Sequence, residues 1–270
     1  DKTVEYINQF CSNSINESHS FALSVGYMLP HQPYVCQKEI YQKFMDKVKL
    51  PEIKEKKFED YHPYLQWWKE NTGSTDITDE ENLRCKAAYS GLVSSLDCMI
   101  GEIIKCLKKN EIFNETIIIY TSDHGDQVGE HGFWWKQTFY EESVKIPLIM
   151  SWKDKLPCNE RRKQILNLVD LTATIVDVGE GMELPNIDGK SFLNIAINKK
   201  HKSKNETFSE FCIDNSLSWS DTKEPHLSRM IRTDDWKFIY YHGYNNQLFN
   251  LKNDPDEMQN LSGLKEYSKI

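Results

Sequence analysis

The sequence lacks any apolar run of the roughly 18 to 20 residues that a membrane-spanning helix needs. It also lacks paired cysteines: seven cysteines are scattered along the chain and none forms a Cys-x-x-Cys pair, so neither a zinc site nor a disulfide framework is indicated. Basic side chains are in the minority, and a formal net charge of −8 gives no general affinity for nucleic acid or anionic membranes. The composition predicts a soluble, globular protein.

The residues that are present are sufficient for a folded core. Of the 270 residues, 39% are hydrophobic and 12% aromatic, which suits one large α/β domain or two modest ones. The chain opens at Asp1 in a polar stretch, without an initiator methionine or the apolar segment of a targeting peptide. We therefore expect a part of a longer protein, whose compartment stays open between cytoplasmic, periplasmic and secreted or lysosomal.

Hydrophobic periodicity predicts alternating helices and strands over the first two thirds of the chain. Apolar residues recur at steps of three and four over 82–110 and again over 167–178, which predicts two helices with one buried stripe each. Continuous apolar runs predict strands at 21–27, 116–121 and 146–150, and the run at 116–121 suits a parallel strand covered on both faces. This order favours a doubly wound α/β sheet.

Residues 206–270 have a different pattern. Short strand-like runs at 207–212, 229–233, 237–241 and 247–251 are separated by polar turns, which predicts a small antiparallel sheet. We therefore divide the chain into a partial α/β core domain over 1–197 and a small α+β subdomain over 206–270.

The most informative segment, TSDHGDQVGEHGFWWKQTFYEESVKIP (121–147), begins where the predicted strand at 116–121 ends. Ligands collect at the carboxyl ends of strands in open α/β sheets, so Asp123 and His124 are candidates for binding a divalent cation. Lys136 follows two tryptophans, and partial desolvation there would strengthen its attraction for an anionic substrate oxygen. Each feature alone has an ordinary explanation, because SDHG is also a common polar turn and Lys136 could be solvated. His31, in the segment LPHQPY (29–34) after the apolar run at 21–27, could be an ordinary loop histidine with a backbone partner.

Together these motifs resemble the carboxy-terminal part of the type I, formylglycine-dependent sulfatases of the alkaline-phosphatase-like superfamily. The resemblance is carried by SVGYMLPHQPY (24–34), AAYSGLVSSLDCMIGEII (87–104), YTSDHGDQVGEHGFWWKQTFYEESVKIPLIMSW (120–152), and IRTDDWKFIYYHG with LFNLKNDPDEMQNL (231–261). It implies an α/β fold with a mostly parallel sheet flanked by helices, whose amino-terminal part is missing from this chain. It also implies the small antiparallel subdomain.

The resemblance further implies roles for four residues. Asp123 and His124 match two ligands of the family's divalent cation, usually Ca²⁺, with His124 at a position where many relatives carry asparagine. Lys136 matches the lysine that contacts a sulfate oxygen and the leaving-group oxygen. His31 matches the histidine that contacts the sulfate and can assist protonation of the leaving group. Such groups stabilise the charge that develops during cleavage of a sulfate ester, or supply the proton.

One family motif is absent from the chain. The motif Cys/Ser-x-Pro/Ala-x-Arg, whose first residue becomes the formylglycine nucleophile, begins at none of the cysteines: Cys158 has arginine at the right offset but Glu160 where proline or alanine belongs. We expect the nucleophile and the first metal ligands upstream of Asp1, and therefore no turnover by this chain alone. The complete protein is expected to cleave a small-molecule or saccharide sulfate ester.

Two other functions stay open. A phosphonate monoester or phosphodiester hydrolase of the same superfamily would share much of this layout, and a non-catalytic fragment or relative would bind sulfated ligands without cleaving them. Among the remaining features, we expect His131 to order its loop, the aromatic residues at 61–68 to pack in the core, and Glu141 and Glu142 to order the segment before Pro147.

Overall fold

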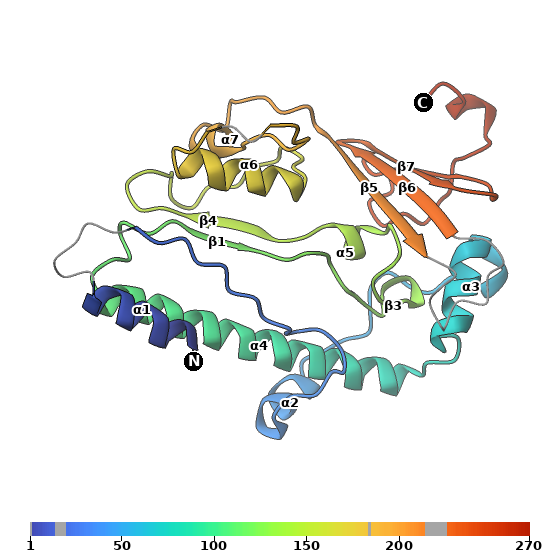
Figure 1. Cartoon of the computed structure of the whole chain (residues 1–270). Coiled ribbons are helices and arrows are strands. Elements are labelled where there is room, and N and C mark those ends of the chain that lie inside the picture. Colours follow the sequence, from blue (N-terminus) through green and yellow to red (C-terminus); the bar gives the residue numbers. More distant parts are fainter. Residues whose placement is uncertain (1, 14–19, 183–184, 214–225) are drawn as a thin grey trace.

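The computed structural model describes residues 2–13, 20–182, 185–213 and 226–270. Helices α1 and α4 lie on one side of strands β1 and β4, helices α6 and α7 lie on the other, and a separate sheet lies beside these layers (Figure 1). No helix in the described ranges combines the length and the apolar character needed to cross a membrane. In chain order the elements are α1 (Lys2–Asn13), α2 (Lys38–Met45), η2 (Phe58–Asp60), α3 (Pro63–Thr72), α4 (Asp79–Lys109), β1 (Ile118–Thr121), β2 (Gln127–Val128), η3 (Glu130–Gly132), β3 (Trp134–Trp135), α5 (Glu141–Val144), β4 (Leu148–Ser151), α6 (Val169–Val178), α7 (Leu193–Ile197), β5 (Glu206–Ile213), β6 (His226–Thr233), β7 (Trp236–Tyr241), β8 (Gln247–Asn250) and η4 (Lys265–Tyr267).

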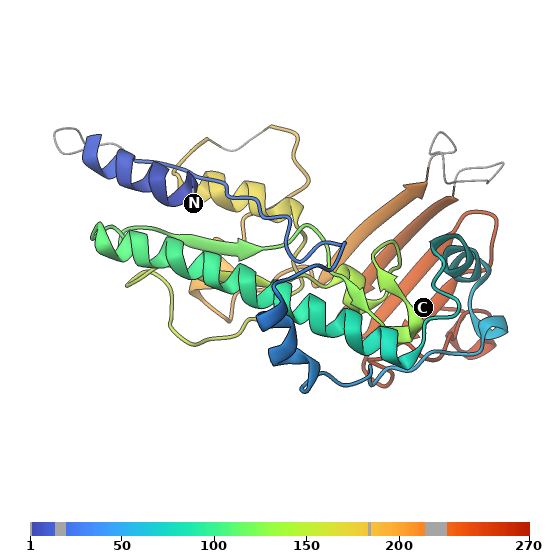
Figure 2. The ribbon, with the colours of Figure 1, turned by 90° about the horizontal axis from the view of Figure 1, so that it is seen from below.

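Helix α4 confirms the helix predicted over 82–110, as α6 confirms the one predicted over 167–178. A capping box starts α4: the Glu81 amide donates to the Thr78 hydroxyl at 3.3 Å, and the Thr78 amide donates to the Glu81 carboxylate at 2.8 Å. Its apolar stripe is buried at Leu92, Leu96 and Leu107. Helices α1 and α2 pack against α4, as Figure 2 shows.

Strands β1 and β4 form an antiparallel ladder that runs from Ile118↔Ser151 to Thr121↔Leu148. The parallel strand covered on both faces that we predicted at 116–121 is therefore not found in the described residues. All four residues of β1 are only half-buried, and Ile149 in β4 is 60% exposed. A continuous apolar run indicates that a strand can be covered, but its direction and cover depend on the neighbouring elements.

The strand predicted at 21–27 is wrong, because these residues form no regular element. A strand needs a neighbour that satisfies its backbone hydrogen-bonding groups, and no ladder of the described residues includes this segment. Leu23 is 40% exposed and Val25 is 36% exposed, so these apolar side chains of the run are not buried as a strand face would be.

The predicted antiparallel sheet at the carboxy terminus is confirmed, with strand order β5-β6-β7-β8. The aromatic residues at 61–68 pack in the core as expected. They share one cluster with the sheet and with residues 133–140: Tyr61, Tyr64, Leu65, Trp68, Phe133, Phe139, Tyr140, Met230, Ile239, Tyr241, Phe249 and Leu251. The division into 1–197 and 206–270 stays a prediction, since side chains from both parts contribute to this cluster.

A buried ion-pair network fastens the sheet to the segment before α5. Lys237 Nζ lies 2.9 Å from Glu141 Oε1 and 2.7 Å from Glu257 Oε1, and it donates to the Phe139 carbonyl at 2.7 Å. The Glu257 carboxylate also accepts from the Glu141 amide at 2.7 Å. Because Lys237 and Glu257 are almost fully buried, each needs these partners, and residues 139–141 are held in place as a result.

Candidate functional site

The SDHG turn follows β1 directly and is held against α5. The Gly125 amide donates to the Ser143 carbonyl at 2.8 Å, and a Cβ atom at Gly125 would lie only 2.0 Å from the Glu142 carbonyl oxygen. Only glycine permits this approach of two backbone segments. The turn therefore presents Asp123 and His124 at the end of β1, where we expected them.

Asp123 and His124 face each other across the turn. Asp123 Oδ2 lies 3.4 Å from His124 Nε2, and Asp123 Oδ1 accepts from the His124 amide at 3.0 Å. His124 Nδ1 lies 2.7 Å from the Gly125 carbonyl, which can only accept, so Nδ1 carries a hydrogen and donates it there. Burial alone would raise the pKa of Asp123, but the adjacent His124 and the hydrogen bonds from His124 and Ser122 hold it below its ordinary value.

Lys136 is placed by the hairpin of β2 and β3. These strands pair antiparallel, with Gln127 opposite Trp135, so Asp126 and Lys136 flank the last rung of the ladder. Trp134 holds the hairpin in place, because it is buried and its indole Nε1 donates to Asn82 Oδ1 at 3.1 Å. Lys136 is half-buried, so its ammonium is neither freely solvated nor enclosed.

The structure brings His31 and Lys136 together although 105 residues separate them. Lys136 Nζ lies 3.2 Å from His31 Nε2. His31 Nδ1 lies 2.6 Å from the Gln32 carbonyl, so Nδ1 donates there and Nε2 accepts from the ammonium group. The two residues that we singled out for contacts to an anion thus share one hydrogen bond.

Sequence reasoning missed Asp126 and Tyr34. The Tyr34 hydroxyl donates to Asp126 Oδ2 at 3.0 Å. Burial raises the pKa of Asp126, although the hydrogen bond from Tyr34 and the nearby charge of Lys136 oppose that rise. Their positions in the sequence could have indicated them, because Asp126 follows His124 by two residues and Tyr34 follows His31 by three.

His131 does not belong to this group. It is fully buried, and its ring stacks on Tyr140 at 3.8 Å between centroids. Its backbone carbonyl accepts from the Tyr61 hydroxyl at 2.6 Å. Burial, together with the charges of Lys56 and Lys237, lowers the pKa of His131 to about 3.

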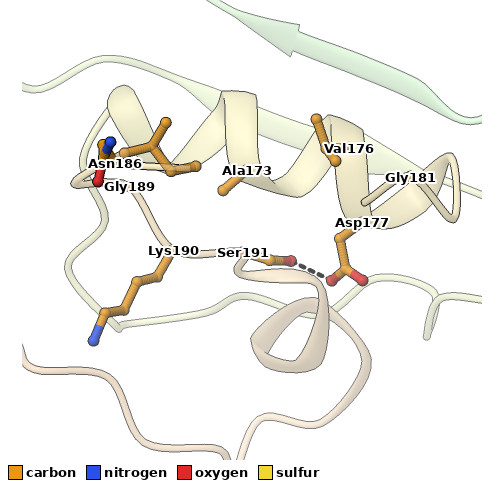
Figure 3. A pocket seen from close by; sticks show the side chains of 9 residues that line it. Ala173, Val176, Asp177, Gly181, Asn186, Gly189, Lys190 and Ser191 are labelled. Carbon is orange, nitrogen blue, oxygen red and sulfur yellow. Dashed lines mark hydrogen bonds between the residues drawn. The ribbon is translucent and has the colours of Figure 1, made fainter. Parts of the chain in front are cut away.

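The described part of the chain has two cavities of about 530 Å³, and both are lined by residues other than His31, Asp123, His124 and Lys136. One is formed by α6 and the segment 186–191; Figure 3 shows the hydrogen bond from the Ser191 hydroxyl to Asp177 at 2.5 Å and Lys190 pointing away from α6. The other includes Tyr61, Tyr140 and Gln247. None of the four residues proposed from the sequence lines either one.

Comparison with known proteins gives two matching family models. The model described as "Sulfatase" matches residues 1–182, and the model described as "N-sulphoglucosamine sulphohydrolase, C-terminal" matches residues 129–270. Among curated relatives, arylsulfatase K of Canis lupus familiaris is 32% identical over 97% of this chain and 51% of its own length. Choline-sulfatase of Rhizobium meliloti (strain 1021) is 29% identical over 93% of this chain and 48% of its own. The chain thus spans about half the length of these relatives.

Solved structures share the fold. A phosphonate monoester hydrolase of Agrobacterium radiobacter superposes with a TM-score of 0.83 at 18% identity, covering 100% of this chain and 58% of that one. A protein solved with its substrate D-glucosamine-2-N,6-O-disulfate superposes with a TM-score of 0.77 at 18% identity, covering 99% and 66%. The predicted α/β fold of the alkaline-phosphatase-like type is confirmed. From the family models and relatives that cover nearly all its residues, the chain belongs to the sulfatase family.

Proposed function

We propose that this chain is the carboxy-terminal part of a sulfuric ester hydrolase, called here the complete protein, which cleaves a sulfate monoester. The observation that carries the proposal is the contact of 3.2 Å between Lys136 Nζ and His31 Nε2 in a chain of the sulfatase family. Two groups suited to an anion meet although 105 residues separate them, and Asp123 and His124 lie on the turn that leads into the hairpin of Lys136.

Lys136 and His31 would bind the sulfate group and supply the proton that the leaving oxygen takes up. One ammonium hydrogen of Lys136 is donated to His31 Nε2, which leaves two hydrogens for a sulfate oxygen and the leaving-group oxygen. Negative charge grows on the leaving oxygen as the sulfur–oxygen bond breaks, and a fixed cation stabilises that charge more than it stabilises the bound ester. The proton that the leaving oxygen needs would come from this pair: Lys136 Nζ carries it in the structure, and His31 Nε2 can accept it and pass it on.

Asp123 and His124 would supply two ligands of the cation, which we propose is Ca²⁺. Their donors fit: Asp123 Oδ2 and His124 Nε2 converge, and the bond from His124 Nδ1 to the Gly125 carbonyl orients the ring as in metal-binding histidines. Ca²⁺ takes about six to eight ligands, mostly oxygen, and the described residues contain no group of three ligating side chains. The remaining ligands would lie upstream. The cation would neutralise charge on the sulfate oxygens.

The nucleophile would also lie upstream, as a formylglycine whose hydrated aldehyde supplies the attacking oxygen. No cysteine of this chain starts the motif that is converted to formylglycine. We therefore expect no turnover by residues 1–270 alone. If the upstream sequence lacks that motif, the alternative of a non-catalytic protein that binds sulfated ligands is favoured.

The substrate would be a small-molecule or saccharide sulfate ester. Support comes from relatives named arylsulfatase K and choline-sulfatase, and from a similar fold solved with a disulfated glucosamine. Similar folds also include phosphonate monoester hydrolases, which keeps that activity as the alternative.

The test measures rates of the complete protein on 4-nitrophenyl sulfate and on an aryl phosphonate monoester. We expect the sulfate ester to be preferred, and we expect Lys136→Ala to lower kcat by at least about 100-fold because it removes a charge that acts in the transition state. Lys145→Ala, an exposed lysine nearby, is the matched control and should keep the wild-type rate. A preference for the phosphonate, or a loss below about threefold in Lys136→Ala, would contradict the proposal or the role of Lys136.

A further inference from the structure

Tyr34 and Asp126 connect the loop that carries His31 to the segment that carries Asp123, His124 and Lys136. Tyr34 lies in the loop that carries His31, and Asp126 lies between the SDHG turn and the hairpin that carries Lys136. Their hydrogen bond of 3.0 Å joins residues that are 92 positions apart. The hydrogen bond of 3.2 Å from Lys136 Nζ to His31 Nε2 also joins these two segments.

The Tyr34 ring packs against helix α4 and strand β3. It packs edge-on against Tyr89 of α4, with 5.6 Å between centroids, and is tilted against Trp134 of β3 at 6.0 Å. Trp134 is itself fixed to Asn82 of α4. The ring is therefore seated against α4 and β3, and its hydroxyl makes the link from the His31 loop to Asp126.

The Asp126 carboxylate reaches the pair through Tyr34. Residues 126 and 136 flank the rung Gln127↔Trp135, so the carboxylate lies on the same end of the hairpin as Lys136. Asp126 Oδ2 accepts the hydrogen of the Tyr34 hydroxyl, so the phenol links the hairpin to the loop that carries His31.

We infer that Asp126 is a positioning residue, which through the Tyr34 hydroxyl fixes the His31 loop so that Nε2 faces Lys136 Nζ. Its meaning for catalysis rests on the proposed function, whereas its effect on His31 does not. Misplacing a reacting group by about 1 Å can cost about 100-fold in rate, so the carboxylate affects turnover without touching the ester.

The first measurement is steady-state kinetics of the complete protein on 4-nitrophenyl sulfate. Asp126→Asn is expected to lower kcat about 10- to 100-fold with KM changed less than about threefold, because orientation acts on the transition state. Tyr34→Phe should lower kcat in the same way, and Asp126→Glu should recover part of the loss. Glu130→Gln is the matched control, since Glu130 accepts from the Val128 amide within the same hairpin and should leave kcat unchanged.

The second measurement does not depend on activity. Two-bond ¹H–¹⁵N spectra of histidine-labelled protein, with His31 assigned from His31→Gln, report which ring nitrogen carries the hydrogen. Wild type should show the Nδ1–H form, and Tyr34→Phe and Asp126→Asn should show a mixture of both forms. An unchanged His31 spectrum in both variants overturns the inference, whatever kcat does. If the wild type does not cleave sulfate esters at all, the proposed function fails, and the spectra alone decide the positioning role.

Discussion

Among single residues, His131 is buried in the core with no hydrogen-bond partner for either ring nitrogen among the described residues. Its Nε2 lies 3.8 Å from Glu142 Oε2, beyond hydrogen-bonding distance, and Lys56 and Lys237 act on it as like charges. Its ring stacks on Tyr140 and its backbone carbonyl accepts from the Tyr61 hydroxyl, so His131 acts as a packing element. This placement agrees with the loop-ordering role expected from the sequence.

The burial of His131 predicts a dependence of stability on pH. The pKa of His131 is about 3 in the folded protein and near 6.5 in the unfolded chain, so the unfolded state binds more protons between these values. The free energy of unfolding should therefore fall as the pH falls from 6.5, by up to about 1.4 kcal/mol per pH unit from this residue. Urea unfolding of the complete protein at pH 7 and pH 5 measures the effect.

His131→Phe keeps an aromatic ring against Tyr140 and removes both unpartnered nitrogens, so it should lose less stability between pH 7 and pH 5 than the wild type does. His201→Phe, at an exposed position, is the control and should behave like the wild type. Equal pH slopes for His131→Phe and the wild type would show that His131 binds its proton in the folded state.

At the level of elements, the contact between the SDHG turn and α5 determines where the candidate metal ligands lie. Gly125 is the point of closest approach, and α5 is in turn held by Glu141 in the buried network around Lys237. The ion-pair network around Lys237 therefore holds α5 in place, and α5 in turn supports the SDHG turn. Glu141 orders this segment, as expected from the sequence.

Gly125→Ala tests this contact. A Cβ atom there would lie 2.0 Å from a backbone oxygen, so the turn or α5 must move, and we expect the free energy of unfolding to fall by at least about 2 kcal/mol. Gly101→Ala in α4 is the matched control, because its Cβ would enter open space and alanine favours a helix by up to about 1 kcal/mol. Chemical unfolding of both variants gives the comparison. Equal stabilities would mean that the turn is not packed against α5.

At the scale of the whole molecule, the described residues supply only part of the ligand set that a Ca²⁺ ion needs. The described residues offer Asp123 and His124 at the expected place and no third ligating side chain beside them. Because Ca²⁺ affinity depends on the number of ligands, two donors are too few for tight binding.

Calorimetry with Ca²⁺ should therefore separate this chain from the complete protein. We expect a Kd at least about 100-fold higher for residues 1–270 than for the complete protein, since most ligands would be missing. Asp123→Ala should abolish tight binding by the complete protein, and Asp188→Ala, at an exposed carboxylate, should not change it. Tight binding by this chain alone would contradict a divided site, and no binding by either protein would favour the non-catalytic alternative.

The sequence by itself determined the elements whose signals are local. The three- and four-residue spacing locates α4, although the predicted start at 82 misses the first turn that the capping box of Thr78 and Glu81 begins. Short runs between polar turns locate β5 to β8. The motifs from SDHG to Lys136 also sufficed to indicate the sulfatase family. These signals act over a few residues, so they need no knowledge of which segments meet.

Only the tertiary structure decided which distant residues are neighbours. His31 meets Lys136 across 105 positions, Tyr34 meets Asp126 across 92, and His131 is enclosed by the core although its neighbours in sequence are polar or glycine. The antiparallel pairing of β1 with β4 and the irregular path of 21–27 likewise depend on neighbours that no local pattern specifies. Packing of whole elements brings these groups together, because burial and hydrogen bonding are satisfied across the molecule rather than along the chain.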